Sequence, residues 1–197
     1  ILVNQITFAQ TNWTVGDMIR TGQMNQILLR PIHPIMDAVA AEFAGKLVYL
    51  IFDVPIVIGL AFLLQPQLDF QPLNGLLFIP ALLMAWALRF FWGYWLALLA
   101  FWATRADALL TLQDTLMFLL AGQVAPVALL PGALQTAALI LPFRSMVAFP
   151  VEVLTGQLQG QALLTGFAIQ TAWLVAAVIL YRLVWKRGLR RYAAIGG

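Results

Sequence analysis

The chain has 197 residues, of which 62% are hydrophobic and only 10% are charged, and its mean hydropathy is +0.90. Soluble globular domains carry about 25% charged residues, so this composition excludes a soluble fold and indicates a membrane protein. Because the apolar runs are long and do not alternate with polar residues, we predict spans that are helices and not barrel strands. We therefore predict an all-α, polytopic transmembrane helical bundle in which residues 1–197 form a single domain.

Two further features of the composition limit the possible contacts and chemistry. The net charge of +3 comes from basic residues beside apolar stretches, so we expect membrane lipids as contacts and no nucleic acid. The chain has no cysteine, which removes disulfides, thiolate metal sites and cysteine nucleophiles.

Apolar stretches long enough to cross a membrane recur along the chain. A hydrocarbon core of about 30 Å needs about 20 helical residues. Four stretches meet this need: Leu47–Leu64, Leu73–Ala103, Ala108–Ala125 and Gln161–Trp185. Ile1–Val15 reads as the tail of a further span, and we expect one or two spans ahead of it. The stretch Leu73–Ala103 is longer than a bilayer requires, so we expect it to tilt, protrude or break at Pro80 or Gly93.

The stretch between the third and fourth predicted spans, residues 126–160, is apolar but interrupted. Its prolines lie too close together for a full crossing: Pro126, Pro131, Pro142 and Pro150. We therefore predict short helices that dip into the outer leaflet as an extracytoplasmic re-entrant helical hairpin.

The basic residues outside the spans are divided unequally between the two sides of the membrane. If the connections alternate sides, one side receives Arg20, Arg30, Lys46, Arg105, Arg182, Lys186, Arg187, Arg190 and Arg191. The other side receives Arg144. The positive-inside rule makes the first side cytoplasmic, which predicts a multi-pass protein of the inner (plasma) membrane.

Signatures of catalysis are missing from the sequence. The single histidine, His33, lies between Pro31 and Pro34, without a second histidine to complete a metal site. No Gly-rich phosphate loop of the G-x-x-x-x-G-K-[ST] type occurs. We expect no catalytic residue, metal or cofactor on this chain.

Two alternative functions stay open: a membrane-embedded lipid-modifying enzyme that uses Asp53 and Asp114, and a passive membrane anchor or assembly factor.

Four ionisable residues fall within apolar stretches, where a charge costs from about 2.5 kcal/mol upward. They are Asp53, Arg89, Asp114 and Glu152. At helical rise, the two aspartates lie at a similar depth from the cytoplasmic end, whereas Arg89 lies in the outer half. We therefore expect Arg89 to pair with Glu152 or another acidic partner there. The sequence leaves two roles possible for these four residues: hydrogen bonding between helices, or contact with a transported substrate.

The cytoplasmic segment, residues 17–46, mixes polar and apolar residues. The run Leu28–Pro34 predicts the end of one helix and the start of another, since a residue before proline disfavours the helical conformation. The segment is amphipathic, and its spacing fits either a helix lying on lipid headgroups or one that docks a cytoplasmic partner.

The run Asp17–Pro34 resembles the I-R-x-G-x-[LM]-x-x-x-L-L-R-P-x-x-P stretch of type-2 ATP-binding-cassette (ABC) permeases, in the branch with about six spans per subunit. Phe101–Arg105 is similar to the cytoplasmic turn of that branch, and Arg187–Tyr192 with Gly196-Gly197 is similar to its C-terminus. Leu141–Arg144 with Phe149-Pro150 resembles its outer hairpin.

The resemblance implies an exporter permease that works with a second permease subunit, identical or different, and with separate ABC ATPase subunits that bind ATP and Mg. It implies that Asp17–Pro34 is the coupling helix, a stiff lever that touches the ATPase. The residues to which it assigns this role are Asp17, Arg20, Gly22, Ile27, Leu28, Leu29, Arg30, Pro31, His33 and Pro34. Ile27, Leu28 and Leu29 are expected to insert into the ATPase, and Arg20 and Arg30 to orient the helix.

Overall fold

The computed structural model describes residues 2–64, 71–103 and 105–195, and this part of the chain is helical with no strand. The all-α prediction is confirmed. In chain order the elements are α1 (Leu2–Thr7), α2 (Thr11–Arg20), α3 (Met24–Leu28), α4 (Pro34–Leu64), α5 (Pro72–Leu98), the 3-10 turn η1 (Leu99–Phe101), α6 (Ala106–Leu120), the 3-10 turn η2 (Val127–Leu129), α7 (Gly132–Ile140), α8 (Phe143–Met146), α9 (Ala148–Leu154) and α10 (Gly160–Ile195).

Three helical stretches are long and apolar enough to cross a membrane: Pro34–Leu64, Pro72–Phe101 and Gly160–Tyr192. The predicted fourth span over Ala108–Ala125 is not among these three stretches. Helix α6 has 15 residues, or about 22 Å, which is less than the hydrocarbon thickness. It ends because Gly122 adopts a φ of 76°, the left-handed conformation that commonly terminates helices and that glycine adopts without strain.

Two of the long helices differ from the sequence prediction. Helix α4 starts at Pro34, well before the predicted start at Leu47, because proline fits the first turn of a helix and no further proline lies between Pro34 and Leu47. Helix α5 is continuous through Pro80 and Gly93, so of the three predicted outcomes, tilt, protrusion or a break, the break does not occur. Gly93 serves packing instead, since a Cβ there would overlap the side chain of Asn12 on α2.

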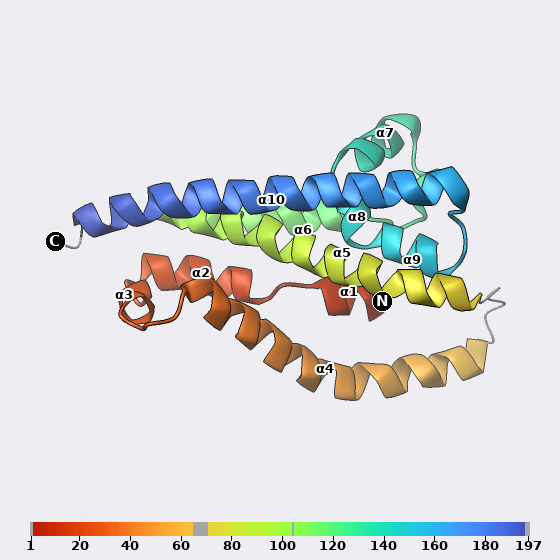
Figure 1. Ribbon diagram of the computed structural model, residues 1–197, viewed down its shortest axis with the longest axis horizontal. Helices are drawn as coiled ribbons and strands as arrows, with labels where there is room; N and C mark the ends of the chain where they lie inside the picture. The colour runs from red at the N-terminus through yellow and green to blue at the C-terminus, as the bar shows by residue number, and fades with distance from the viewer. Residues whose placement is uncertain (1, 65–70, 104, 196–197) are drawn as a thin grey trace.

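Helix α5 is the centre of the bundle (Figure 1). It packs against α1, α2, α6, α8, α9 and α10, and α10 follows it along most of its length. Helix α4 instead bows away from the bundle, and among the described residues its main contacts are with α1 and α2. No residue from Leu47 to Leu64 is buried, so this apolar half of α4 needs lipid or another protein around it.

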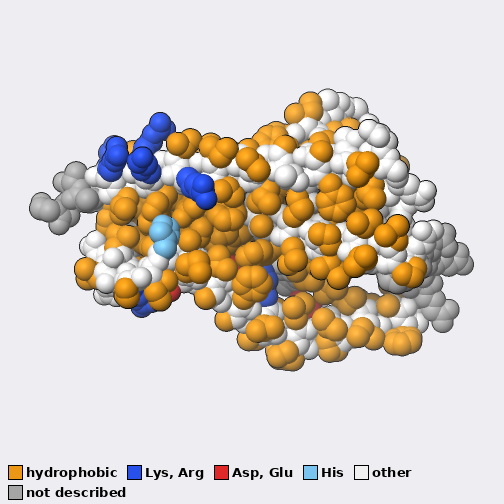
Figure 2. Space-filling model, in the orientation of Figure 1, with side chains coloured by type: hydrophobic (Ala, Val, Ile, Leu, Met, Phe, Trp, Pro, Cys, Tyr) orange, Lys and Arg blue, Asp and Glu red, His pale blue; other side chains and the backbone are white. Residues whose placement is uncertain are grey.

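The two ends of the bundle differ in charge. Figure 2 shows Lys and Arg side chains gathered on α10 at the end near α3, while hydrophobic side chains cover most of the remaining face. The four short elements η2, α7, α8 and α9 lie toward the opposite end, where the sequence predicted a hairpin of short helices. Their insertion into the outer leaflet stays a prediction.

The break between α1 and α2 is closed by two charged side chains of α4. Glu42 Oε1 accepts hydrogen bonds from the backbone nitrogen and Oγ1 of Thr11 at 2.6 and 2.7 Å. Lys46 donates to the carbonyl oxygen of Phe8, and its Nζ lies 3.0 Å from Glu42 Oε2. Glu42 is only 4% exposed, so these hydrogen bonds form away from solvent. They give partners to the backbone nitrogen of Thr11 and the carbonyl oxygen of Phe8, where the helix is interrupted.

The prediction that Arg89 pairs with Glu152 is wrong. The Arg89 guanidinium instead contacts α1, donating to the carbonyl oxygen and Oδ1 of Asn4 at 3.2 and 2.8 Å and to Oγ1 of Thr7 at 3.2 Å. Glu152 on α9 pairs with Arg144 on α8, and Nε and Oε1 are 3.2 Å apart. A depth estimate cannot choose between partners at one depth, because it carries no information about which helices are neighbours.

The two aspartates within the apolar stretches have different surroundings. Asp114 on α6 accepts a long hydrogen bond of 3.5 Å from Gln113 and is near enough to Arg89 for their charges to interact. Asp53 lies in the exposed half of α4, and its buried Oδ2 has no hydrogen-bond partner among the described residues. Hydrogen bonds between helices therefore account for the charged Arg89 within an apolar stretch. No described contact accounts in this way for Asp53.

The pairing of Arg144 with Glu152 predicts coupled effects on stability. We expect the changes Arg144→Leu and Glu152→Gln to be non-additive in the free energy of unfolding, by about 0.5–3 kcal/mol, because their side chains touch. The measurement is a double-mutant cycle by denaturant unfolding in detergent. In a control cycle, Arg89→Leu and Glu152→Gln should be additive within about 0.5 kcal/mol. Strict additivity in the first cycle would contradict the observed pair.

Candidate coupling surface

The segment between α2 and α4 forms two turns around the short helix α3. Helix α2 ends at Arg20, and Gly22 follows with a φ of 78°, which favours glycine. Helix α3 ends at Leu28 and α4 begins at Pro34, so the predicted change of helix within Leu28–Pro34 is confirmed. We call residues 24–36, which comprise α3, the following turn and the first residues of α4, the coupling surface.

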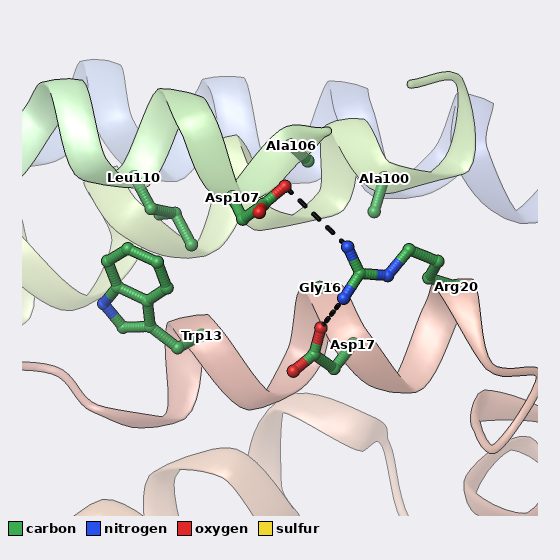
Figure 3. A pocket seen from close by; sticks show the side chains of 8 residues that line it. All are labelled: Trp13, Gly16, Asp17, Arg20, Ala100, Ala106, Asp107 and Leu110. Atoms are coloured by element: carbon green, nitrogen blue, oxygen red, sulfur yellow. Dashed lines mark hydrogen bonds and ion pairs between the residues drawn. The ribbon is translucent and has the colours of Figure 1, made fainter. Parts of the chain in front are cut away.

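Arg20 connects α2 to the start of α6 (Figure 3). Its guanidinium pairs with Asp17 one turn earlier on α2, and its Nη1 lies 3.8 Å from Oδ1 of Asp107. Both carboxylates are more than half exposed, so each pair contributes at most about 1 kcal/mol. The small side chains of Ala100 and Ala106 line the same pocket, on the side of α6 and opposite α2.

Aromatic contacts connect the coupling surface to α10. The ring of His33 lies 5.1 Å from that of Trp185, measured between centroids. Tyr192 donates from its hydroxyl to the carbonyl oxygen of Gly22 at 3.4 Å. Both α10 rings also pack on Phe101 of η1, at 6.3 Å for Trp185 and 5.5 Å for Tyr192. The η1 turn, the C-terminal part of α10 and both turns beside α3 therefore meet at one aromatic cluster.

The turn before α4 is closed by its own polar contacts. Arg30 Nη1 and Asp37 Oδ2 lie 3.0 Å apart, which joins the end of α3 to the first turn of α4. Nδ1 of His33 accepts a hydrogen bond from the backbone nitrogen of Ile35 at 3.3 Å. These contacts, with the prolines Pro31 and Pro34, restrict the backbone of the turn.

The apolar residues of this segment divide between two environments. Leu29 is 87% exposed, whereas Ile27 and Leu28 pack partly against the chain's own core. Ile32 and Met36, which the sequence analysis did not select, are 52% and 59% exposed. The apolar residues available to a partner are therefore Leu29, Ile32 and Met36. The hydrophobicity of a residue does not distinguish these three from the partly buried Ile27 and Leu28. Which side of the segment faces the core is decided by tertiary packing.

The intramembrane residues do not contribute to the coupling surface. The contacts of Arg89, Asp114 and Glu152 described above involve α1, α6 and α8, and Asp53 lies further along α4. Within the described part of the chain, no three His, Asp or Glu side chains lie close enough together to hold a metal ion.

Comparison with known proteins identifies the family. A family model described as "ABC-2 family transporter protein" matches residues 1–196. No curated protein and no solved structure matches the chain. The match covers nearly the whole sequence, from α1 to the end of α10, and agrees with the resemblance found in Asp17–Pro34. The chain therefore belongs to the ABC-2 family of transporter proteins.

Proposed function

We propose that this chain is the membrane-spanning permease subunit of an ABC exporter, located in the inner (plasma) membrane and driven by a separate ATPase subunit. The observation that carries the proposal is the coupling surface, where Leu29, Ile32 and Met36 are exposed on a turn with restricted geometry. Exposed apolar side chains on a rigid turn are suited to insertion into a cleft of a partner protein. ATP and Mg would bind to the ATPase and not to this chain.

The contacts of the coupling surface explain how a movement there would reach the spans. Helix α4 starts within the surface and continues without interruption to Leu64, so a tilt of the turn tilts the whole helix. His33 and Tyr192 connect the same region to α10, and Arg20 connects it to α6. A rigid-body movement of the ATPase could therefore be transmitted to three helices together.

A second permease subunit, identical or different, completes the proposed transporter. The half of α4 from Leu47 to Leu64 is almost entirely apolar, with Asp53 as its one charged residue, and has no helix packed along it in the described part of the chain. Two such subunits would form a pathway at their interface, above two ATPase subunits. Membrane lipids would surround the remaining apolar surface.

Weakening the coupling surface should weaken ATPase binding. We expect Leu29→Ser with Ile32→Ser to reduce the affinity for the ATPase at least about tenfold, because burying each side chain contributes about 1.5–3 kcal/mol. The measurement is a binding titration of purified permease with labelled ATPase, together with transport-coupled ATP hydrolysis.

A matched control lies at the other end of the molecule. Leu139→Ser with Ile140→Ser changes the same residue types on α7, where they are 48% and 64% exposed, and should leave ATPase binding unchanged. If the Leu29/Ile32 variant binds the ATPase as the wild type does, the coupling role is refuted. A helix that merely lies on headgroups would change its lipid affinity and leave ATP turnover unaffected.

The proposed orientation can be tested by labelling. Asn25 on α3 and Gln157, between α9 and α10, are exposed at opposite ends of the bundle. A cysteine at Gln157 should react with an impermeant thiol reagent in intact cells, whereas a cysteine at Asn25 should react only after the membrane is permeabilised. Labelling of Asn25→Cys in sealed cells would reverse the orientation and remove the ATPase from the coupling surface.

A further inference from the structure

A recess lies between the start of α4 and residues 178–185 of α10. Its volume is about 390 Å³, and its apolar floor comprises Ile35 of α4, Phe91 of α5 and Val178 of α10. Arg182 lies at its rim, and the contacting rings of His33 and Trp185 form one wall. In Figure 2 the single histidine lies near the basic side chains of α10, with hydrophobic side chains between and beside them.

Within the described part of the chain, the charge at the rim has no protein counterion. Arg182 is exposed and forms no ion pair with any carboxylate among the described residues. An exposed cation above an apolar floor matches an amphiphile with an anionic head and an apolar tail. A second protein copy seated there would have to remove the Arg182 guanidinium from water without an evident partner, which is costly.

We propose that this recess binds an anionic phospholipid. The phosphate lies at Arg182, and one acyl chain lies over Ile35, Phe91 and Val178. Basic pockets between membrane helices on the cytoplasmic side are suited to anionic headgroups, and tryptophan rings such as that of Trp185 are enriched at the headgroup level. Because His33 belongs to the coupling surface and Trp185 to α10, the bound lipid contacts both. The proposal rests on the membrane location and does not require the ATPase.

The test measures lipid retention by the purified full-length protein. The protein is reconstituted with phosphatidylcholine and a minor share of phosphatidylglycerol, and the lipids that stay bound after extraction are identified by native mass spectrometry. Wild type should retain phosphatidylglycerol preferentially. Arg182→Gln should reduce that preference about fivefold, which corresponds to about 1 kcal/mol for one basic residue. The matched control Arg190→Gln removes the same charge from an exposed position of α10 outside the recess and should preserve the preference.

A second variant tests the apolar floor without changing the charge. Val178→Trp fills the recess and should lower phosphatidylglycerol retention even though Arg182 is intact. An excess of inorganic phosphate should not displace the lipid from wild type, because phosphate lacks the acyl chain. Equal losses for Arg182→Gln and Arg190→Gln, or full displacement by phosphate, would overturn the proposal. Cross-linking between two copies through Val178→Cys in the reconstituted protein would overturn it too, by assigning the recess to a permease interface.

Discussion

The fold depends on satisfying the backbone and charged groups at the break between α1 and α2. In an apolar environment each buried polar group without a partner costs about 1–3 kcal/mol, so an interrupted helix is stable only where side chains replace the lost hydrogen bonds. Glu42 and Lys46 of α4 supply such hydrogen bonds to the backbone at the break, and Arg89 of α5 supplies one to the backbone of α1. These contacts hold α1 and α2 between the two long helices. They thereby set the direction in which α2 leads to α3 and the coupling surface.

Close packing around α5 makes the bundle suited to transmitting movement. Ala81, Ala85 and Ala97 on α5 are fully buried, and Gly93 lets Asn12 of α2 approach the helix. Small residues at helix contacts allow the backbones to come close together, which is how membrane helices gain packing energy without a hydrophobic driving force. A bundle packed in this way moves as a unit when one end is displaced. The aromatic cluster around Phe101 joins that unit to the turns beside α3.

Helix α4 has two environments along its length. Its first half lies against α1 and α2 and holds the Glu42–Lys46 pair, whereas its second half has no buried residue. One continuous helix thus connects the coupling surface with a span whose neighbours must be lipid or other protein. Displacement of the turn at Pro34 would change the position of that span, because the helix continues from one half into the other. Pro55 lies inside the helix without ending it.

Much of this architecture follows from the sequence. Long apolar runs predicted the three long helices, proline geometry predicted the change of helix between Leu28 and Pro34, and the match to the family confirms the resemblance carried by Asp17–Pro34. These features are local, since hydropathy and the φ angle of proline do not depend on distant residues. The length of α6, the partners of Arg89 and Glu152, and the exposure of Leu29 beside the half-buried Leu28 were decided by tertiary structure. Each depends on which helix faces meet, and residue spacing along one chain does not contain that information.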